Sequence, residues 1–71
     1  SDVDTQLYGY GKVADKADFA TAPKPGMFDI KRKAMHRRWK DVAATGISPQ
    51  DAEKKYLQMA EDLKNKYSPV D

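Results

Sequence analysis

The sequence contains no cysteine and no long apolar run. Without cysteine it can form neither a disulfide framework nor a thiolate metal site, which excludes a disulfide-stapled secreted domain and a zinc finger. The longest apolar stretch is two or three residues, far short of the ~20 needed to cross a bilayer. No basic segment followed by an apolar one opens the chain, so we expect an intracellular protein: cytoplasmic, or mitochondrial if a transit peptide preceded Ser1.

Motifs for catalysis are also missing. His36 is the only histidine, and the cations that share its predicted helix face supply no carboxylate to orient it as a base. Glycine-rich phosphate loops and a serine nucleophile motif are absent, and no cluster of histidine, aspartate and glutamate has metal-ligand spacing. We therefore expect no enzyme activity, no metal and no cofactor, and we assign His36 to a solvated face.

The amino-acid composition is typical of a small globular protein, and the charges are unevenly distributed along the chain. The 71 residues are 39% hydrophobic and 34% charged, which is too apolar for a disordered chain and sufficient for one domain over residues 1–71. Residues 24–40 carry seven basic side chains and only one acidic one. This excess favours an anionic partner, whether a phosphate-bearing ligand, nucleic acid or a membrane surface.

Apolar residues recur at helical spacing in three segments. They predict an all-α fold with helices at about 2–17, 30–43 and 49–67. The predicted apolar faces are Val3, Leu7, Tyr10, Ala14 and Ala17; Met35, Trp39 and Val42; and Ala52, Tyr56, Met59, Leu63 and Tyr67.

Two of these helices have recognisable starts. Asp29 is an N-cap residue for the second helix, and Ser48 to Asp51 form an S-x-x-D capping box with proline at the first helical position. Between the first two helices, residues 18–28 contain two prolines and a glycine and therefore predict a loop. Phe19, Met27 and Phe28 are apolar enough to pack this loop onto the helices.

Three polar side chains suggest a binding site. Tyr8 and Lys12 lie one turn apart beside the apolar face of the first predicted helix, and Tyr56 lies within that of the last. Two phenols and an ammonium can frame a phosphate-bearing head group, because hydroxyls donate to phosphate oxygens and lysine adds a positive charge. In the alternative interpretation both tyrosines are core aromatics and Lys12 is a surface charge. We expect Trp39 to belong to the core rather than to stack on a nucleic-acid base.

The order of four segments resembles that of the acyl-CoA-binding protein family. The segments are LYGYGKVA at 7–14, PKPGMFD at 23–29, KRKAMHRRW at 31–39 and DAEKKYLQMAEDLKNKY at 51–67, and they cover nearly the whole chain. The resemblance implies an antiparallel helical bundle, with three of the family's four helices visible here. It also implies non-catalytic binding of long-chain acyl-CoA through a basic head-group site and an apolar groove.

The same resemblance implies roles for individual residues. Tyr8, Lys12 and Tyr56 match positions that contact the nucleotide part of the ligand, and Lys31 and Lys33 match basic positions nearby.

The sequence also departs from the family pattern. Met35 stands where the family has a further lysine for the ligand's phosphate, and Gly11 stands in place of a tyrosine. The family's first helix has no counterpart, so we expect the apolar face of residues 2–17 to be only partly covered.

These departures support a second interpretation beside acyl-CoA carriage. In it the same fold is a structural or interaction subunit of a larger assembly, with a protein partner over the surface of the missing helix and ligand binding weakened or lost. A nucleic-acid-binding helix ranks third, and we do not expect a nucleic-acid partner.

Overall fold

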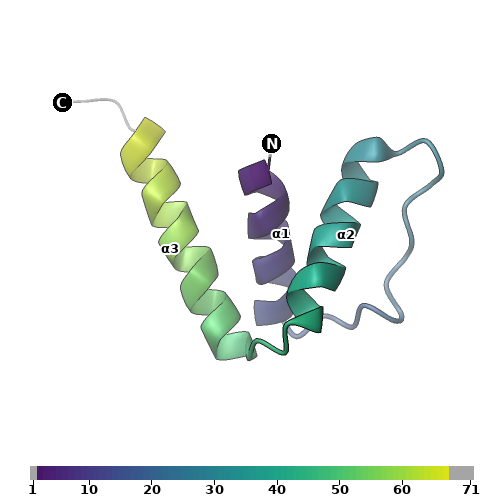
Figure 1. Ribbon diagram of the computed structural model, residues 1–71, viewed down its shortest axis with the longest axis horizontal. Helices are drawn as coiled ribbons and strands as arrows, with labels where there is room; N and C mark the ends of the chain where they lie inside the picture. Colours follow the sequence, from purple (N-terminus) through teal and green to yellow (C-terminus); the bar gives the residue numbers. More distant parts are fainter. Residues whose placement is uncertain (1, 68–71) are drawn as a thin grey trace.

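The computed structural model describes residues 2–67, which form three helices and no strand. These are α1 (Asp2–Ala14), α2 (Ile30–Ala44) and α3 (Pro49–Tyr67). Figure 1 shows α1 between the other two: α1 and α2 run in the same direction, and α3 runs back against them. Within this part of the chain α1 packs against both α2 and α3, which do not pack against each other. The predicted all-α class is confirmed.

The first helix ends earlier than the apolar spacing predicts. It stops at Ala14, and Lys16 adopts the left-handed conformation with φ of 59°. The Lys16 N–H donates to the Val13 carbonyl at 3.0 Å, and the Ala17 N–H donates to the Lys12 carbonyl at 3.1 Å. This pair of hydrogen bonds is the Schellman motif that closes a helix. Ala17 therefore lies outside α1, although it continues the apolar spacing in the sequence.

The other two helices begin where their caps predict. The Arg32 N–H donates to Asp29 Oδ1 at 3.2 Å, and the Asp51 N–H donates to Ser48 Oγ at 3.1 Å. Each bond satisfies a backbone donor that the first turn of a helix leaves without an intrahelical partner. The caps fix the directions in which α2 and α3 leave their preceding loops.

The buried core is small. Among the described residues it consists of Trp39, Val42 and Ala52, which are 3%, 6% and 0% exposed. Gly9 lets α1 approach α2 closely, because a Cβ on it would lie 3.0 Å from Val42 Cγ2 and 3.2 Å from the Arg38 carbonyl oxygen. Such contacts are tighter than most Cβ atoms make, so a larger residue at this position would require Val42 and Arg38 to move by a few tenths of an ångström.

The predicted apolar face of α1 is only partly covered, as expected. Leu7, Tyr10 and Ala14 are half-buried, and Val3 is 38% exposed. On α3, the side chain of Tyr67 lies outside the described residues. Within residues 2–67, no helix has both the length and the hydropathy that a membrane span requires.

The connection between α1 and α2 only partly packs as predicted. The Phe19 ring lies on α2, with its centroid 5.1 Å from that of Trp39. Met27 and Phe28 do not pack, since they are 75% and 91% exposed. The reason is a turn in which the Asp29 N–H donates to the Gly26 carbonyl at 3.2 Å and places Met27 and Phe28 at its outer positions.

Candidate functional site

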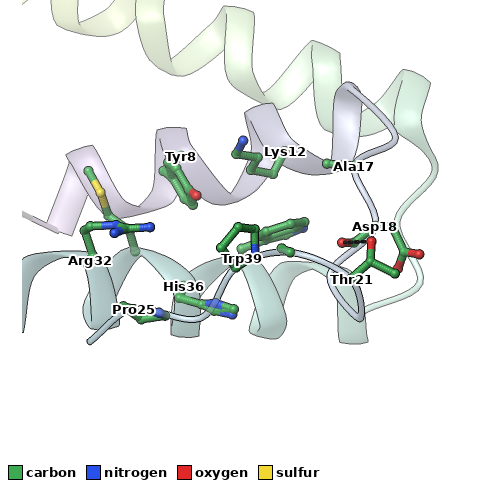
Figure 2. A pocket seen from close by; sticks show the side chains of 12 residues that line it. Tyr8, Lys12, Ala17, Asp18, Thr21, Pro25, Arg32, His36 and Trp39 are labelled. Atoms are coloured by element: carbon green, nitrogen blue, oxygen red, sulfur yellow. Dashed lines mark hydrogen bonds between the residues drawn. The ribbon is translucent and has the colours of Figure 1, made fainter. Parts of the chain in front are cut away.

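Aromatic and basic side chains gather in a pocket of about 460 Å³ between α1, the following loop and α2. Figure 2 shows Tyr8 and Lys12 of α1 above the Arg32, His36 and Trp39 side chains of α2. We call this the aromatic pocket. Its remaining walls come from Met35 and from the loop residues Ala17, Asp18, Thr21, Ala22, Pro23 and Pro25.

Trp39 organises the aromatic pocket. Its ring centroid lies 6.3 Å from that of Tyr8, 5.1 Å from that of Phe19 and 5.8 Å from that of His36, and all three pairs are edge-to-face. This geometry directs the positive edge of one ring to the negative face of another and is favourable beyond simple burial. The expected core position of Trp39 is confirmed.

His36 is not part of a solvated face, so that prediction is wrong. It is half-buried, and its ring centroid lies 4.3 Å from that of Phe19. The contact joins α2 to a loop residue 17 positions earlier in the sequence, a pairing that helical periodicity does not encode. The loop therefore folds over this face of α2.

Lys12 carries the charge at the centre of the site. Its Nζ lies 5.4 Å from the Tyr8 ring centroid and 5.7 Å from the Trp39 ring centroid, which is cation–π distance. It has no ion pair with a carboxylate in the part of the chain that the structure describes. The two rings thus hold the ammonium in place, and its charge is free for an incoming anion.

Two other charged groups of the aromatic pocket are already engaged. Arg32 Nε lies 3.8 Å from Asp29 Oδ2, and both side chains are well exposed, so this pair holds the guanidinium only weakly. Asp18 Oδ1 accepts a hydrogen bond from the Ala20 N–H at 3.0 Å, which closes a local turn. An anion entering the pocket meets Lys12 and Arg32 as attractive charges and Asp18 as a repulsive one.

A smaller pocket of about 230 Å³ lies between Tyr56 of α3 and the Tyr8 and Lys12 side chains of α1. We call it the tyrosine pocket; it is lined by Leu7, Tyr8, Gly11, Lys12, Asp15 and Tyr56. Gly11 lets the Tyr56 ring approach α1, because a Cβ at Gly11 would lie 3.2 Å from Tyr56 Cε2. The structure therefore brings Tyr8, Lys12 and Tyr56 to the lining of one pocket.

The two predicted basic positions on α2 lie elsewhere. Lys31 lines a groove of about 520 Å³ between α1 and α2, together with Asp4, Thr5, Ile30, Ala34, Met35, Arg37, Arg38 and Asp41. Met35 lines both this α1–α2 groove and the aromatic pocket, so the two are neighbours. Lys33 is exposed and lines neither of them.

Sequence reasoning missed the α2 wall of the aromatic pocket. Its members Arg32, Met35, His36 and Trp39 fall at i, i+3, i+4 and i+7, so they share one face of a helix. The sequence pattern indicates this spacing, but it assigns Met35 and Trp39 to an apolar face and His36 to a cationic face. Among residues 2–67 no group of three histidine, aspartate or glutamate side chains is placed to hold a metal ion.

The family model and the known proteins that match this chain all carry the same description. The family model described as Acyl CoA binding protein matches residues 1–60. Acyl-CoA-binding protein homolog 1 of Caenorhabditis elegans is 39% identical over 61 residues, which are 86% of this chain and 64% of that protein. The acyl-CoA-binding protein homolog of Manduca sexta is 38% identical over 58 residues, which are 82% of this chain and 62% of that protein.

A longer protein shares the same region. Acyl-CoA-binding domain-containing protein 2 of Arabidopsis thaliana is 33% identical over 63 residues, 89% of this chain but 17% of that protein. This chain spans less than two thirds of the worm and moth relatives. No solved structure matches it at a significant level. Because the family model covers residues 1–60 of the 71, the chain belongs to the acyl-CoA-binding protein family.

Proposed function

We propose that this chain binds long-chain acyl-CoA as a single non-catalytic domain, with the phosphorylated head group centred on Lys12. The observation that carries the proposal is the position of this ammonium, which borders the aromatic pocket and the tyrosine pocket at once. A head group with several phosphates and an adenine ring needs both a fixed cation and aromatic surface. Family membership supports the same ligand.

In this proposal Lys12, Tyr8 and Tyr56 contact different parts of the head group. Lys12 supplies a charge-assisted contact to a phosphate, and the Tyr8 and Tyr56 hydroxyls donate to phosphate or ribose oxygens. Arg32 adds a second cation, since its exposed pair with Asp29 is easily exchanged for a phosphate. Lys31 and Lys33, outside the two pockets, raise the local positive potential and steer the anionic ligand toward them.

The acyl chain is assigned to the α1–α2 groove. This groove meets the aromatic pocket at Met35 and carries the apolar side chains of Ile30 and Ala34. The alkyl stem of Arg37, an exposed residue, adds apolar surface while its charged end stays in water. In this proposal the tail of a ligand with its phosphates at Lys12 passes Met35, which lines both the aromatic pocket and the groove.

Titration with palmitoyl-CoA tests the proposal directly. Binding is expected with one ligand per chain, and the affinity should fall as salt is raised, because screening weakens the attraction between phosphates and the exposed cations. Isothermal calorimetry at low and high ionic strength measures both quantities. Free CoA is expected to bind more weakly because it lacks the tail. Absence of binding, or an affinity that does not change with salt, contradicts the head-group assignment.

Met35→Lys is expected to tighten palmitoyl-CoA binding by about tenfold. The substitution places a third cation at the junction of the aromatic pocket and the α1–α2 groove, and a hydrogen bond to a charged group contributes about 1.5–3 kcal/mol before desolvation of the half-buried site is subtracted. Met27→Lys is the matched control, since it adds the same charge at an exposed position outside these pockets. Equal effects of the two variants would mean that the phosphates do not lie near Met35.

A further inference from the structure

The turn between the loop and α2 presents apolar side chains to solvent. Met27, Phe28 and Ile30 are 75%, 91% and 80% exposed, more than any other large apolar residue described. Met27 and Phe28 line none of the pockets above. Central turn positions are most often filled by glycine, proline, asparagine, aspartate or serine, so the turn itself does not require an apolar pair at Met27 and Phe28.

The backbone holds these side chains outward. The Asp29 N–H donates to the Gly26 carbonyl at 3.2 Å, and the Ile30 N–H donates to the Phe28 carbonyl at 3.1 Å. Asp29 then caps α2 through the Arg32 N–H. The turn is thus fixed to the start of a helix, and a partner that covers it has little backbone entropy to remove. Figure 1 places it at the upper right corner of the molecule, away from α3.

Basic side chains surround the apolar pair. Lys24 precedes it in the loop, and Lys31 and Lys33 follow it in the first turn of α2, all three exposed. The one acidic residue in the segment, Asp29, is occupied by the cap and by Arg32. We call Lys24, Lys31 and Lys33 the basic collar of the apolar pair. This arrangement is complementary to the surface of an anionic bilayer, where apolar groups enter the acyl boundary and lysines contact the lipid phosphates.

We propose that residues 24–33 dock this protein onto anionic lipid bilayers, with Met27 and Phe28 inserted at the interface. A bilayer fits better than nucleic acid, because nucleic acid offers phosphates but no apolar phase for a methionine and a phenylalanine. Met27 and Phe28 line neither the pockets at Lys12 nor the α1–α2 groove, so insertion of these two side chains does not require acyl-CoA, although Arg32 of the same segment lines the aromatic pocket. Ile30 and Lys31 also line the α1–α2 groove, so a docked molecule holds that groove near the membrane.

Vesicle co-sedimentation without acyl-CoA tests this surface. The protein is expected to bind phosphatidylcholine vesicles that contain phosphatidylserine, to bind pure phosphatidylcholine much less, and to dissociate at high salt. The double variant Met27→Ala/Phe28→Ala should lower the partition coefficient about tenfold or more, because it removes two buried apolar groups from the docked state. Leu57→Ala is the matched control, as it removes exposed apolar surface from α3 and should bind like the original protein.

A second pair of variants tests the basic collar. Lys24→Gln should lower vesicle binding about fivefold, the effect of one lysine at an anionic surface, whereas Lys64→Gln on α3 should not. All these residues are exposed, so circular dichroism should show unchanged folding, and palmitoyl-CoA titration should show unchanged affinity. Equal vesicle binding by the double variant and Leu57→Ala, or no preference for anionic vesicles, would overturn the proposal. Binding to a DNA duplex without binding to vesicles would overturn it too.

Discussion

Replacing Lys12 with alanine is expected to weaken palmitoyl-CoA binding about tenfold or more while the helices remain folded. The proposed phosphate contact is a charge-assisted hydrogen bond, and such a bond contributes about 1.5–3 kcal/mol. The ammonium also lies over the Tyr8 and Trp39 rings, where a cation–π contact contributes about 0.5–1 kcal/mol. Affinity should therefore fall more than stability. Calorimetric titration and urea denaturation of the same variant measure the two losses.

Lys16→Ala separates the role of Lys12 from that of charge alone. Lys16 is an exposed lysine one turn further along, outside both pockets at Lys12. Its left-handed backbone is about equally strained with lysine or alanine, so the control changes net charge without changing the fold. A Lys12→Ala variant that loses as much unfolding free energy as binding free energy would show that the lysine serves the aromatic cluster and not the ligand.

Local signals in the sequence were sufficient to predict the helices. The caps at Asp29 and Ser48 act over three residues, so the starts of α2 and α3 could be read directly. The end of α1 could not. It depends on Lys16 entering the left-handed region, and no glycine marks that position. The apolar spacing continues to Ala17, so it does not indicate that the helix ends at Ala14.

Within the candidate site, the proximity of Tyr8 and Lys12 could be predicted from the sequence. Tyr8 and Lys12 are an i, i+4 pair, so their proximity followed from helix geometry. The packing of Phe19 on His36 depends instead on how a loop folds back over α2, which no periodicity describes. The exposure of Met27 and Phe28 also escaped prediction, because composition suggested burial while the turn at Gly26 directs both outward.

Trp39→Ala is expected to have the largest effect on stability, a loss of about 3–5 kcal/mol, which is typical when a buried tryptophan is deleted. Trp39 is 3% exposed and contacts the rings of Tyr8, Phe19 and His36. It therefore joins α1, the loop and α2 at one point. At about 0.05–0.15 kcal/mol per residue, such a loss is comparable to the total stability of a chain of 71 residues. Urea denaturation followed by circular dichroism measures it without relying on tryptophan fluorescence.

Two matched variants identify the cause of that loss. Trp39→Phe keeps an aromatic ring in the cluster and should lose much less, whereas Phe28→Ala deletes an aromatic ring that is 91% exposed and should change stability by no more than about 0.5 kcal/mol. Because a ligand that binds only the folded chain adds stability by mass action, saturating palmitoyl-CoA should partly restore Trp39→Ala if Lys12 and Tyr56 still hold the head group. Equal stability of Trp39→Ala and the original protein would show that the three segments do not depend on this ring. The aromatic pocket would then have no fixed wall on α2.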